Sequence, residues 1–579
     1  RRTAMPPTPG KGAGVEFRLT ATEYPALRLL PPALLLALVL PPALPAQDSL
    51  STSDTTRAAA PHDSAGRPIA FLADTDSLGR PIIRYISIYR ADIYDTNEAT
   101  SFIPRLMNGL HFKTHANIVS REILLHPGDP YDSAKVAETA RNLRGLGIFR
   151  KVRLDTVSTD SGLVLKVFTQ DGWSTQADVR FRSAGHQTDW QLALIELNLI
   201  GTATRFATRY RHTPDRSQLS FQFLQPRLLA RSVSLGLRYE HRSDGTRGQI
   251  AIERPFFSLS DKAGITTLFD ARNERMLRFF NGNGTAGDSL RRRYAIAEVE
   301  AAKALRRGTG GYLRLGVFGQ VRRDDYAPWP ANTTTRRITG TFGPFLEWRK
   351  ADYVVTRGFA RFGRDEDVDV SDFARVGLYA APSLFGYNQD GIGGVAQLRI
   401  GTKLGRSFAW FDARANGVET SAGLDSGSVT LGVTGVYTPN RRHLLITHAD
   451  VGWIKNPLPA TEFDLGFAVG PRAFPIHAFT GDRTYFATAE YRYNFGEDVF
   501  KALDMGVAGF IDHGGAWYSG TPRRYGTDVG IGFRLSASRA ADANPTRFDL
   551  AYRFKNDAQR AGWVFVIASG LVFSTQPRE

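Results

Sequence analysis

One feature constrains the fold more than any other: apolar and polar residues alternate from Thr175 to Phe573. A period of two places successive side chains on opposite faces of a β-strand. The segment "TYFATAEYRYNF" is an example. One face carries Tyr485, Ala487, Ala489, Tyr491, Tyr493 and Phe495. The other carries Thr484, Thr488, Glu490, Arg492 and Asn494, interrupted by Phe486. The alternation predicts that this part of the chain is built from β-strands.

Roughly eighteen to twenty such segments can be marked, each about ten residues long. A soluble β protein would also alternate, but here aromatics recur near the strand ends, and glycine and charged residues share the polar face. Lipid requires a closed barrel, whose apolar face meets hydrocarbon and whose polar face meets a wet lumen. We therefore predict a mostly β chain with a C-terminal transmembrane antiparallel β-barrel over residues 175–579. Only "RRYAIAEVEAAKAL", near Arg292, favours a helix by propensity, because it is rich in alanine.

The N-terminal part of the chain has a different composition. Arg28 precedes an apolar stretch from Leu29 to Leu44 that paired prolines interrupt, and small residues follow up to Ala46. This order is typical of an export signal, so residues 1–46 are predicted to be a signal peptide with a possible N-terminal extension. Residues 47–80 are rich in Ser, Thr, Asp, Ala and Pro and are predicted to be a disordered linker.

Residues 81–172 predict a small α/β domain of βααββ order. "IIRYISIYRA" indicates a strand, and "THANIVSREILL" a helix with Thr114 as its N-cap. "DSAKVAETARNLRGLGIF" indicates a second helix that ends near Gly147. "RKVRLDTV" and "LVLKVFTQ" indicate two further strands.

Composition and motifs exclude several classes of function. The chain of 579 residues has no cysteine, which excludes disulfides, thiolate metal sites and cysteine nucleophiles. It contains no HExxH pair, P-loop or GxSxG elbow, so we predict no enzyme activity, no cofactor and no metal. The net charge of +16 leaves open a solvated basic surface or attraction to anionic lipid or polymer. No zinc-finger spacing, basic helix or RNA-binding signature is present, so nucleic acid is not an expected partner.

The order of signal, βααββ module and barrel resembles the BamA/TamA-type outer-membrane assembly and translocation superfamily, or bacterial surface antigen family, over residues 81–573. "REILLHPGDPYDSAKVAETARNLRGLGIFRKVRL" is similar to the pattern of a single POTRA domain, with some twenty extra residues before its first helix. "LNLIGTATRF" resembles the family's turn after the second strand. The resemblance implies a barrel of sixteen strands and a periplasmic POTRA-like domain.

The resemblance also implies specific site residues. "GPRAFP" looks like the family's Arg-Gly-aromatic motif on the sixth outer loop, with Arg472 as its arginine, Phe474 as its aromatic residue and alanine in place of the glycine. By position, Glu490 and Asp512 match the lumenal acids that hold this arginine by charge-assisted hydrogen bonds. From the residues alone, these could equally be ordinary lumen charges. "GLVF", Gly570 to Phe573, resembles the last-strand assembly signal, although "STQPRE" follows it.

The function implied by the resemblance is insertion or translocation of proteins at the bacterial outer membrane. The POTRA-like domain would capture unfolded β-barrel or secreted client proteins by strand addition, and a weak seam would lie between the first strand, "TQADVRFRS", and the last, "GWVFVIASGLVF". Outer-membrane lipids and other assembly factors of the periplasm or outer membrane are the further expected partners. The alternative is an outer-membrane pore or surface antigen that passes solutes without inserting clients.

Overall fold

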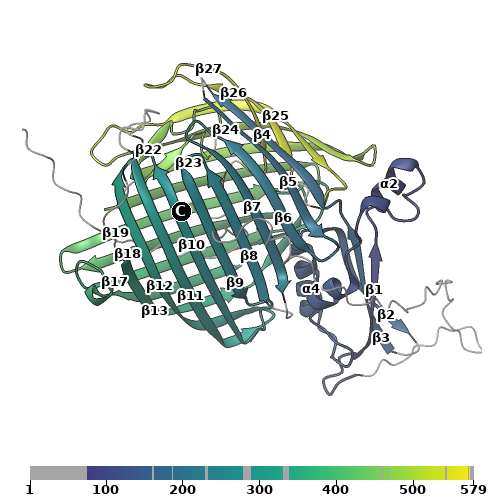
Figure 1. The fold of residues 1–579 in the computed structure, drawn as a ribbon. Helices are drawn as coiled ribbons and strands as arrows, with labels where there is room; N and C mark the ends of the chain where they lie inside the picture. Colours follow the sequence, from purple (N-terminus) through teal and green to yellow (C-terminus); the bar gives the residue numbers. More distant parts are fainter. Residues whose placement is uncertain are drawn as a thin grey trace, which may run out of the picture.

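The computed structural model describes residues 75–159, 162–184, 187–228, 233–277, 279, 289–329, 331, 338–457, 461–466, 469–541, 544–571 and 573. They form a small α/β domain beside one end of a β-barrel (Figure 1). The predicted signal peptide, residues 1–46, and most of the predicted linker, residues 47–74, lie outside the described residues.

The N-terminal domain consists of three helices and a three-stranded sheet, and α2 is largely exposed, with Pro104 as its one buried residue. Its elements are β1 (Ile83–Ala91), α2 (Phe102–Leu110), α3 (Ala116–Glu122), α4 (Ser133–Gly145), β2 (Phe149–Thr159) and β3 (Gly162–Asp171). The sheet order is β1-β3-β2, with β3 parallel to β1 and antiparallel to β2. Its core includes Ile83, Val119, Leu143, Ile148, Leu165 and Val167. The predicted strands and the two predicted helices are confirmed, and the extra residues before them contribute α2.

Local chemistry explains where these helices begin and end. The Asp132 side chain caps α4 by accepting from the backbone N–H groups of Ala134 and Lys135, and Gly147, at φ +68°, follows its last turn. The prediction that Thr114 caps α3 is wrong, because the residue before Ala116 is His115. The Thr114 hydroxyl instead accepts a hydrogen bond from the side-chain amide of Asn198, near the end of β5.

In the described part of the chain, 20 antiparallel strands close into one barrel. The first ten are β4 (Thr175–Ala184), β5 (Gln187–Leu199), β6 (Thr204–His212), β7 (Ser217–Leu228), β8 (Val233–Arg242), β9 (Gly245–Arg254), β10 (Ala263–Met276), β11 (Leu290–Gly308), β12 (Gly311–Pro328) and β13 (Ile338–Lys350). The others are β16 (Asp372–Ala381), β17 (Gly391–Leu404), β18 (Ser407–Thr420), β19 (Gly423–Tyr437), β20 (His443–Lys455), β23 (Arg483–Val499), β24 (Leu503–Trp517), β25 (Gly526–Ala537), β26 (Thr546–Arg553) and β27 (Gly562–Ser569).

The barrel therefore does not have the sixteen strands that the family resemblance implies. The count from alternation, roughly eighteen to twenty strands, is correct. The segment near Arg292 is not a helix but part of β11, which pairs with β10 and β12 along its length. Hydrogen bonding to two neighbouring strands overrides the helix propensity of its alanines.

The two faces of the barrel wall differ as the alternation predicts. On β12, Leu315, Val317 and Val321 are 48%, 60% and 56% exposed, while the even-numbered Arg314 and Gln320 are buried on the inner side. The same pattern recurs around the barrel, which gives it an apolar outer wall and a charged inner wall. No helix among the described residues has both the length and the apolar character to cross a membrane.

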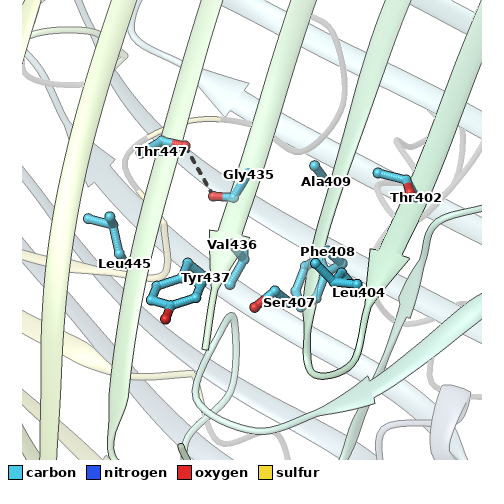
Figure 2. Close-up of a pocket in the computed structure, with 10 residues that line it drawn as sticks. All are labelled: Thr402, Leu404, Ser407, Phe408, Ala409, Gly435, Val436, Tyr437, Leu445 and Thr447. Atoms are coloured by element: carbon cyan, nitrogen blue, oxygen red, sulfur yellow. Dashed lines mark hydrogen bonds between the residues drawn. The ribbon is translucent and has the colours of Figure 1, made fainter. Parts of the chain in front are cut away.

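Small residues hollow the outer wall between β17 and β20. A groove of about 290 Å³ lies over β17, β18, β19 and β20 (Figure 2). Ala409 and Gly435 have little side chain to fill it, and Leu404, Tyr437 and Leu445 are among the residues that line it. The groove is apolar, like the wall around it.

The lumen differs from the wet channel that alternation suggests, because two inserted segments enter it. One is the hairpin of β14 (Tyr353–Thr356) and β15 (Glu366–Asp369), which connects β13 to β16. The other connects β20 to β23 and contains β21 (Phe463–Leu465) and β22 (Phe479–Gly481). Their apolar side chains join inward-facing residues of the wall in one cluster, which includes Val354, Phe359, Val368, Phe408, Trp410, Leu465, Phe474, Phe479 and Phe486.

The N-terminal domain is bonded to the end of the barrel that lies beside it. Arg227 of β7 donates two hydrogen bonds to the buried carboxylate of Glu122, at 2.8 and 2.9 Å. Glu138 of α4 accepts from the backbone N–H of Leu259 at 2.7 Å. The turn after β5 contributes the carbonyl of Gly201, which accepts from the backbone N–H of His115. These contacts join the domain and the barrel over several turns.

Candidate functional site

The most heavily bonded side chain in the lumen belongs to the segment between β20 and β23. The connection lies at the barrel end opposite the N-terminal domain, and it is the eighth such connection, not the sixth of the family pattern. Four additional strands precede it, which accounts for the shift. Beyond β21 the chain turns at Pro471, whose carbonyl accepts from the backbone N–H of Phe474, and this turn carries Arg472 into the barrel.

Arg472 is 1% exposed and bonds to acids of three strands. Its Nε and Nη2 donate to the two carboxylate oxygens of Asp512, at 2.6 and 3.1 Å. Its Nη1 lies 3.0 Å from Glu490 and 3.4 Å from Asp549. The guanidinium also lies 3.6 Å from the centre of the Phe510 ring. The structure thus brings together the predicted arginine and both predicted acids.

Three further arginines complete this network, and sequence reasoning did not assign them to the site. Arg492 donates to Glu490 at 2.6 Å, and Arg534 bridges Glu490 at 3.0 Å and Asp549 at 2.5 Å. Arg547 donates to Asp549 at 3.2 Å. Alternation already places these residues on polar strand faces, but it does not show which inward residues meet. Mutual pairing is what makes so many buried charges tolerable.

The two residues that follow Arg472, Ala473 and Phe474, also contact the barrel wall. The backbone N–H of Ala473 donates to Asp528 at 3.0 Å, and the side chain of Ala473 lies in a buried apolar cluster with Phe510 and Val566. Phe474 is fully buried and packs against Phe479, with ring centres 5.1 Å apart. Its ring covers Gly526 of β25, where an added Cβ would lie 2.2 Å from a ring carbon. The predicted aromatic residue therefore depends on a glycine in the opposing wall.

His477 anchors the same segment near the barrel mouth. Its Nε2 lies 2.7 Å from Asp215, in the turn between β6 and β7, and its Nδ1 contacts Asp464. The Phe279 ring stacks on the imidazole, with centres 3.5 Å apart. Burial alone would lower the pKa of His477, but the hydrogen bonds to the two aspartates outweigh it and raise this pKa to about 9. The imidazole is thus positively charged at neutral pH.

The lumenal hairpin connects this network to the N-terminal domain. Arg492 donates to the carbonyls of Gly358 and Phe359, at 3.1 and 2.7 Å. The tip of the hairpin is held by Glu366, which accepts from the backbone N–H of Phe359 at 2.9 Å. Burial raises the pKa of Glu366 to about 7. The next residue, Asp367, accepts hydrogen bonds from Arg144 of α4.

The predicted assembly signal, Gly570 to Phe573, lies after the last strand and not within it. The last strand ends at Ser569, and Gly570 follows with φ +76°. Phe573 lies in the lumenal apolar cluster and stacks on His448 of β20, with ring centres 4.2 Å apart. Both residues therefore follow the last strand, and whether they act as an assembly signal stays a prediction.

The chemistry of this site is one of pairing and packing. Its arginines and carboxylates bond to one another, which suits holding a segment in place. Among the described residues, no group of three His, Cys, Asp or Glu side chains is arranged to hold a metal ion.

Comparisons with known proteins return structural similarity alone. No family model matches the sequence, and no curated protein matches it. BamA from Haemophilus ducreyi lacking POTRA domains 1–3 is similar with a TM-score of 0.35 and 10% identity, covering 84% of each chain. CdiB from Acinetobacter baumannii gives a TM-score of 0.42 and 9% identity, covering 85% of this chain and 74% of that one. CdiB from Escherichia coli gives 0.46 and 10%, covering 84% and 76%.

Proposed function

We propose that this chain is an outer-membrane barrel of the BamA/TamA-type superfamily that inserts or translocates protein clients. The observation that carries the proposal is the position of Arg472. Its turn folds into the lumen, where Asp512 and Glu490 hold the guanidinium at 2.6 and 3.0 Å. This is the arrangement that the family resemblance implies, formed by the residues that the sequence motif named. The apolar outer wall of the closed barrel supports a place in a membrane.

The N-terminal domain supports a role in client capture. Its βααββ order, with the small helix α2 inserted, resembles that of a POTRA domain, and its contacts with the barrel turns would place it in the periplasm. In its three-stranded sheet, β1 and β2 each have one neighbour, so each offers a free edge among the described strands. An extended client segment could add to such an edge through backbone hydrogen bonds.

The closure of the barrel supports a seam that opens. The first and last barrel strands, β4 and β27, pair through two residue pairs, Phe181 with Ile567 and Arg182 with Val566. The neighbouring pair of β26 and β27 has eight, from Thr546–Ser569 to Arg553–Gly562. Separating β4 from β27 breaks the fewest backbone hydrogen bonds, and the exposed edges could template a client strand.

The lumen argues against a simple solute pore. The hairpin of β14 and β15 and the segment between β20 and β23 both enter it, and their side chains pack with the wall in one apolar cluster. A solute would have to displace these segments, whereas opening at the seam leaves them in place. We therefore favour protein clients that enter at an opened seam of the wall over solutes that pass through the lumen.

A reversible lock of the seam tests the proposal. The chain has no cysteine, so F181C/I567C would introduce a single disulfide between the facing residues of β4 and β27. Cells would be depleted of the natural protein and given this variant, and their outer-membrane and secreted proteins quantified. The locked variant should fail to restore the clients lost on depletion, and a reductant should restore them.

A matched control and the outcomes complete this experiment. L550C/F565C cross-links facing residues of β26 and β27 and should leave function intact. Loss of several barrel proteins on depletion would identify an insertase, and loss of one secreted protein a dedicated translocator. Unchanged clients together with altered uptake of small solutes would overturn the proposal and favour the pore.

A further inference from the structure

The helix α2 turns its apolar side away from the protein. Residues three and four positions apart share one side of a helix, which groups Phe102, Ile103, Leu106 and Leu110, and we call these four the α2 apolar face. Phe102 is 75% exposed, and Ile103 and Leu110 are each 65% exposed. A surface helix normally directs such a stripe to the core. Large apolar side chains left exposed together mark an interaction site.

The opposite side of α2 is bonded to the N-terminal domain, which fixes the orientation of the helix. Asn108 donates to the carbonyl of Tyr94 at 2.8 Å and accepts from the backbone N–H of the same residue at 3.1 Å. Pro104, on the same side of the helix as Asn108, is buried. Figure 1 shows α2 standing apart from α4. The apolar face is therefore exposed because of how the helix is held.

One arginine holds the loop before α2 beside a turn of the barrel. Arg539, which follows β25, donates to Glu98 of this loop at 3.1 Å. It also donates to Asp498, near the end of β23, at 2.8 Å and to the carbonyl of Lys501 at 3.1 Å. The centre of the Tyr94 ring lies 4.7 Å from the guanidinium carbon. The loop that leads into α2 is thus fixed beside the turn between β23 and β24.

This turn has the features of a membrane boundary. Phe500 lies in it and is 92% exposed. Tyr491 and Phe495 precede it on the outward face of β23 and are exposed as well. Aromatic side chains gather where the apolar core of a bilayer meets its headgroups. Lipid around the barrel would therefore end near Phe500, beside the place where α2 is held.

We propose that the α2 apolar face lies in the lipid leaflet that adjoins the N-terminal domain, among the acyl chains next to the headgroups. An amphipathic helix can lie in the plane of this interface with its apolar face buried. No acidic residue occurs from Ala99 to Arg121, so no carboxylate of this stretch would have to leave water. The inference rests on the part of the proposed function that places the barrel in a membrane, and it needs no client.

The chemistry of α2 favours lipid over an extended client segment. Strand addition needs a free backbone edge, whereas the backbone N–H and C=O groups within a helix are bonded to one another. The α2 apolar face offers side chains alone, which suits the non-directional contact that acyl chains make. Its role would be to hold the domain against the membrane.

Spin labels on the full chain in lipid vesicles test this inference. The chain has no cysteine, so L106C, V317C and T156C each provide a single attachment site. They lie on the α2 apolar face, on the outer wall at β12 and on an exposed part of β2. The measurement is the ratio of accessibility to oxygen, which dissolves in acyl chains, over accessibility to a nickel chelate, which stays in water. We expect this ratio to be about threefold higher at L106C and V317C than at T156C.

A second set of variants removes the apolar face itself. With F102N/I103N added, the ratio at L106C should fall to that at T156C, because the helix loses its apolar contact with lipid. The same pair added to V317C is the control and should leave its ratio unchanged. Heat-dependent gel mobility would show that each barrel is folded, and L110C replaces L106C should that variant fail to fold.

The outcomes separate this inference from the proposed function. A label at L106C that reports water while V317C reports lipid would overturn the inference and leave the membrane barrel intact. Water at both positions would overturn both, because the barrel wall itself would then lie outside the lipid. A label at L106C that reports water until a urea-unfolded β-barrel protein is added, and is then immobilised, would replace lipid with a client.

Discussion

Asp367 of the lumenal hairpin accepts two hydrogen bonds from the guanidinium of Arg144 on α4, at 2.6 and 2.7 Å. From there the hairpin extends to its tip, where its backbone carbonyls accept from Arg492, which also bonds to Glu490. Glu490 in turn accepts from Arg472. A continuous series of contacts thus joins the N-terminal domain to the arginine in the lumen.

We expect this pair to couple the domain to the hairpin. R144E or D367R alone should loosen the hairpin, because each places two like charges together. The charge swap R144E/D367R should recover most of the loss, which a double-mutant cycle on the unfolding free energy would measure. Since the pair is partly exposed, a coupling of about 1 kcal/mol is expected. A swap no better than the single changes would show that the contact is not coupling the two parts.

Removal of the lumenal arginine should be far more costly. R472A leaves Asp512, Glu490 and Asp549 without their shared partner, and breaking such a buried group costs about 3–5 kcal/mol. Urea unfolding in detergent, followed by gel mobility, would measure the loss. R406A, at an exposed turn between β17 and β18, is the control and should be neutral within about 0.5 kcal/mol. A stability of R472A equal to that of R406A would contradict the assignment.

The contact between Phe474 and Gly526 predicts that a larger residue at position 526 is harmful and that a smaller one at position 474 compensates in part. G526A should push the Phe474 ring away, because the new methyl group would lie 2.2 Å from a ring carbon. We expect the segment around Phe474 to become sensitive to proteases, and F474L to relieve part of the effect in the double variant. G509A on β24 is the control, since an added Cβ there meets nothing within 4 Å. Equal protease resistance of both glycine variants would contradict the fit.

The raised pKa of His477 predicts a pH dependence at the barrel mouth. Because the pKa of about 9 exceeds the ordinary 6.5, the stabilisation is complete below pH 6.5 and is lost as the pH rises through about 9. A spin label on T461C should therefore become more mobile above this pH. In H477Q the label should be mobile at every pH. A pH-independent label in the wild-type background would show that the histidine does not anchor the segment.

The parts of the fold that the sequence predicted depend on local pattern. Alternation identified strands, their inner and outer faces and the approximate strand count, because side-chain direction in a strand follows from neighbours two residues apart. The helix α4 followed from its cap and its apolar spacing. The sixteen-strand expectation failed because it came from a resemblance, and resemblance carried no information about the four additional strands.

The site was predicted in part. Arg472, Glu490 and Asp512 were named from a motif and from position, and they do meet. Asp549 and Arg534 were on the correct strand faces but could not be assigned, because alternation gives no information about which inward residues of different strands face each other. Their pairing depends on strand order and on the depth to which the turn enters the barrel.

By itself, the sequence determined that this chain has strands with one apolar and one charged face, a preceding α/β domain and no cysteine chemistry. Only the tertiary structure decided that the barrel closes with 20 strands, that the hairpin of β14 and β15 enters the lumen and that its apolar side chains form a cluster with the barrel wall. The physical reason is the range of the interactions. Side-chain direction is fixed within a few residues, whereas closure and lumen packing depend on hydrogen bonds and contacts between residues hundreds of positions apart.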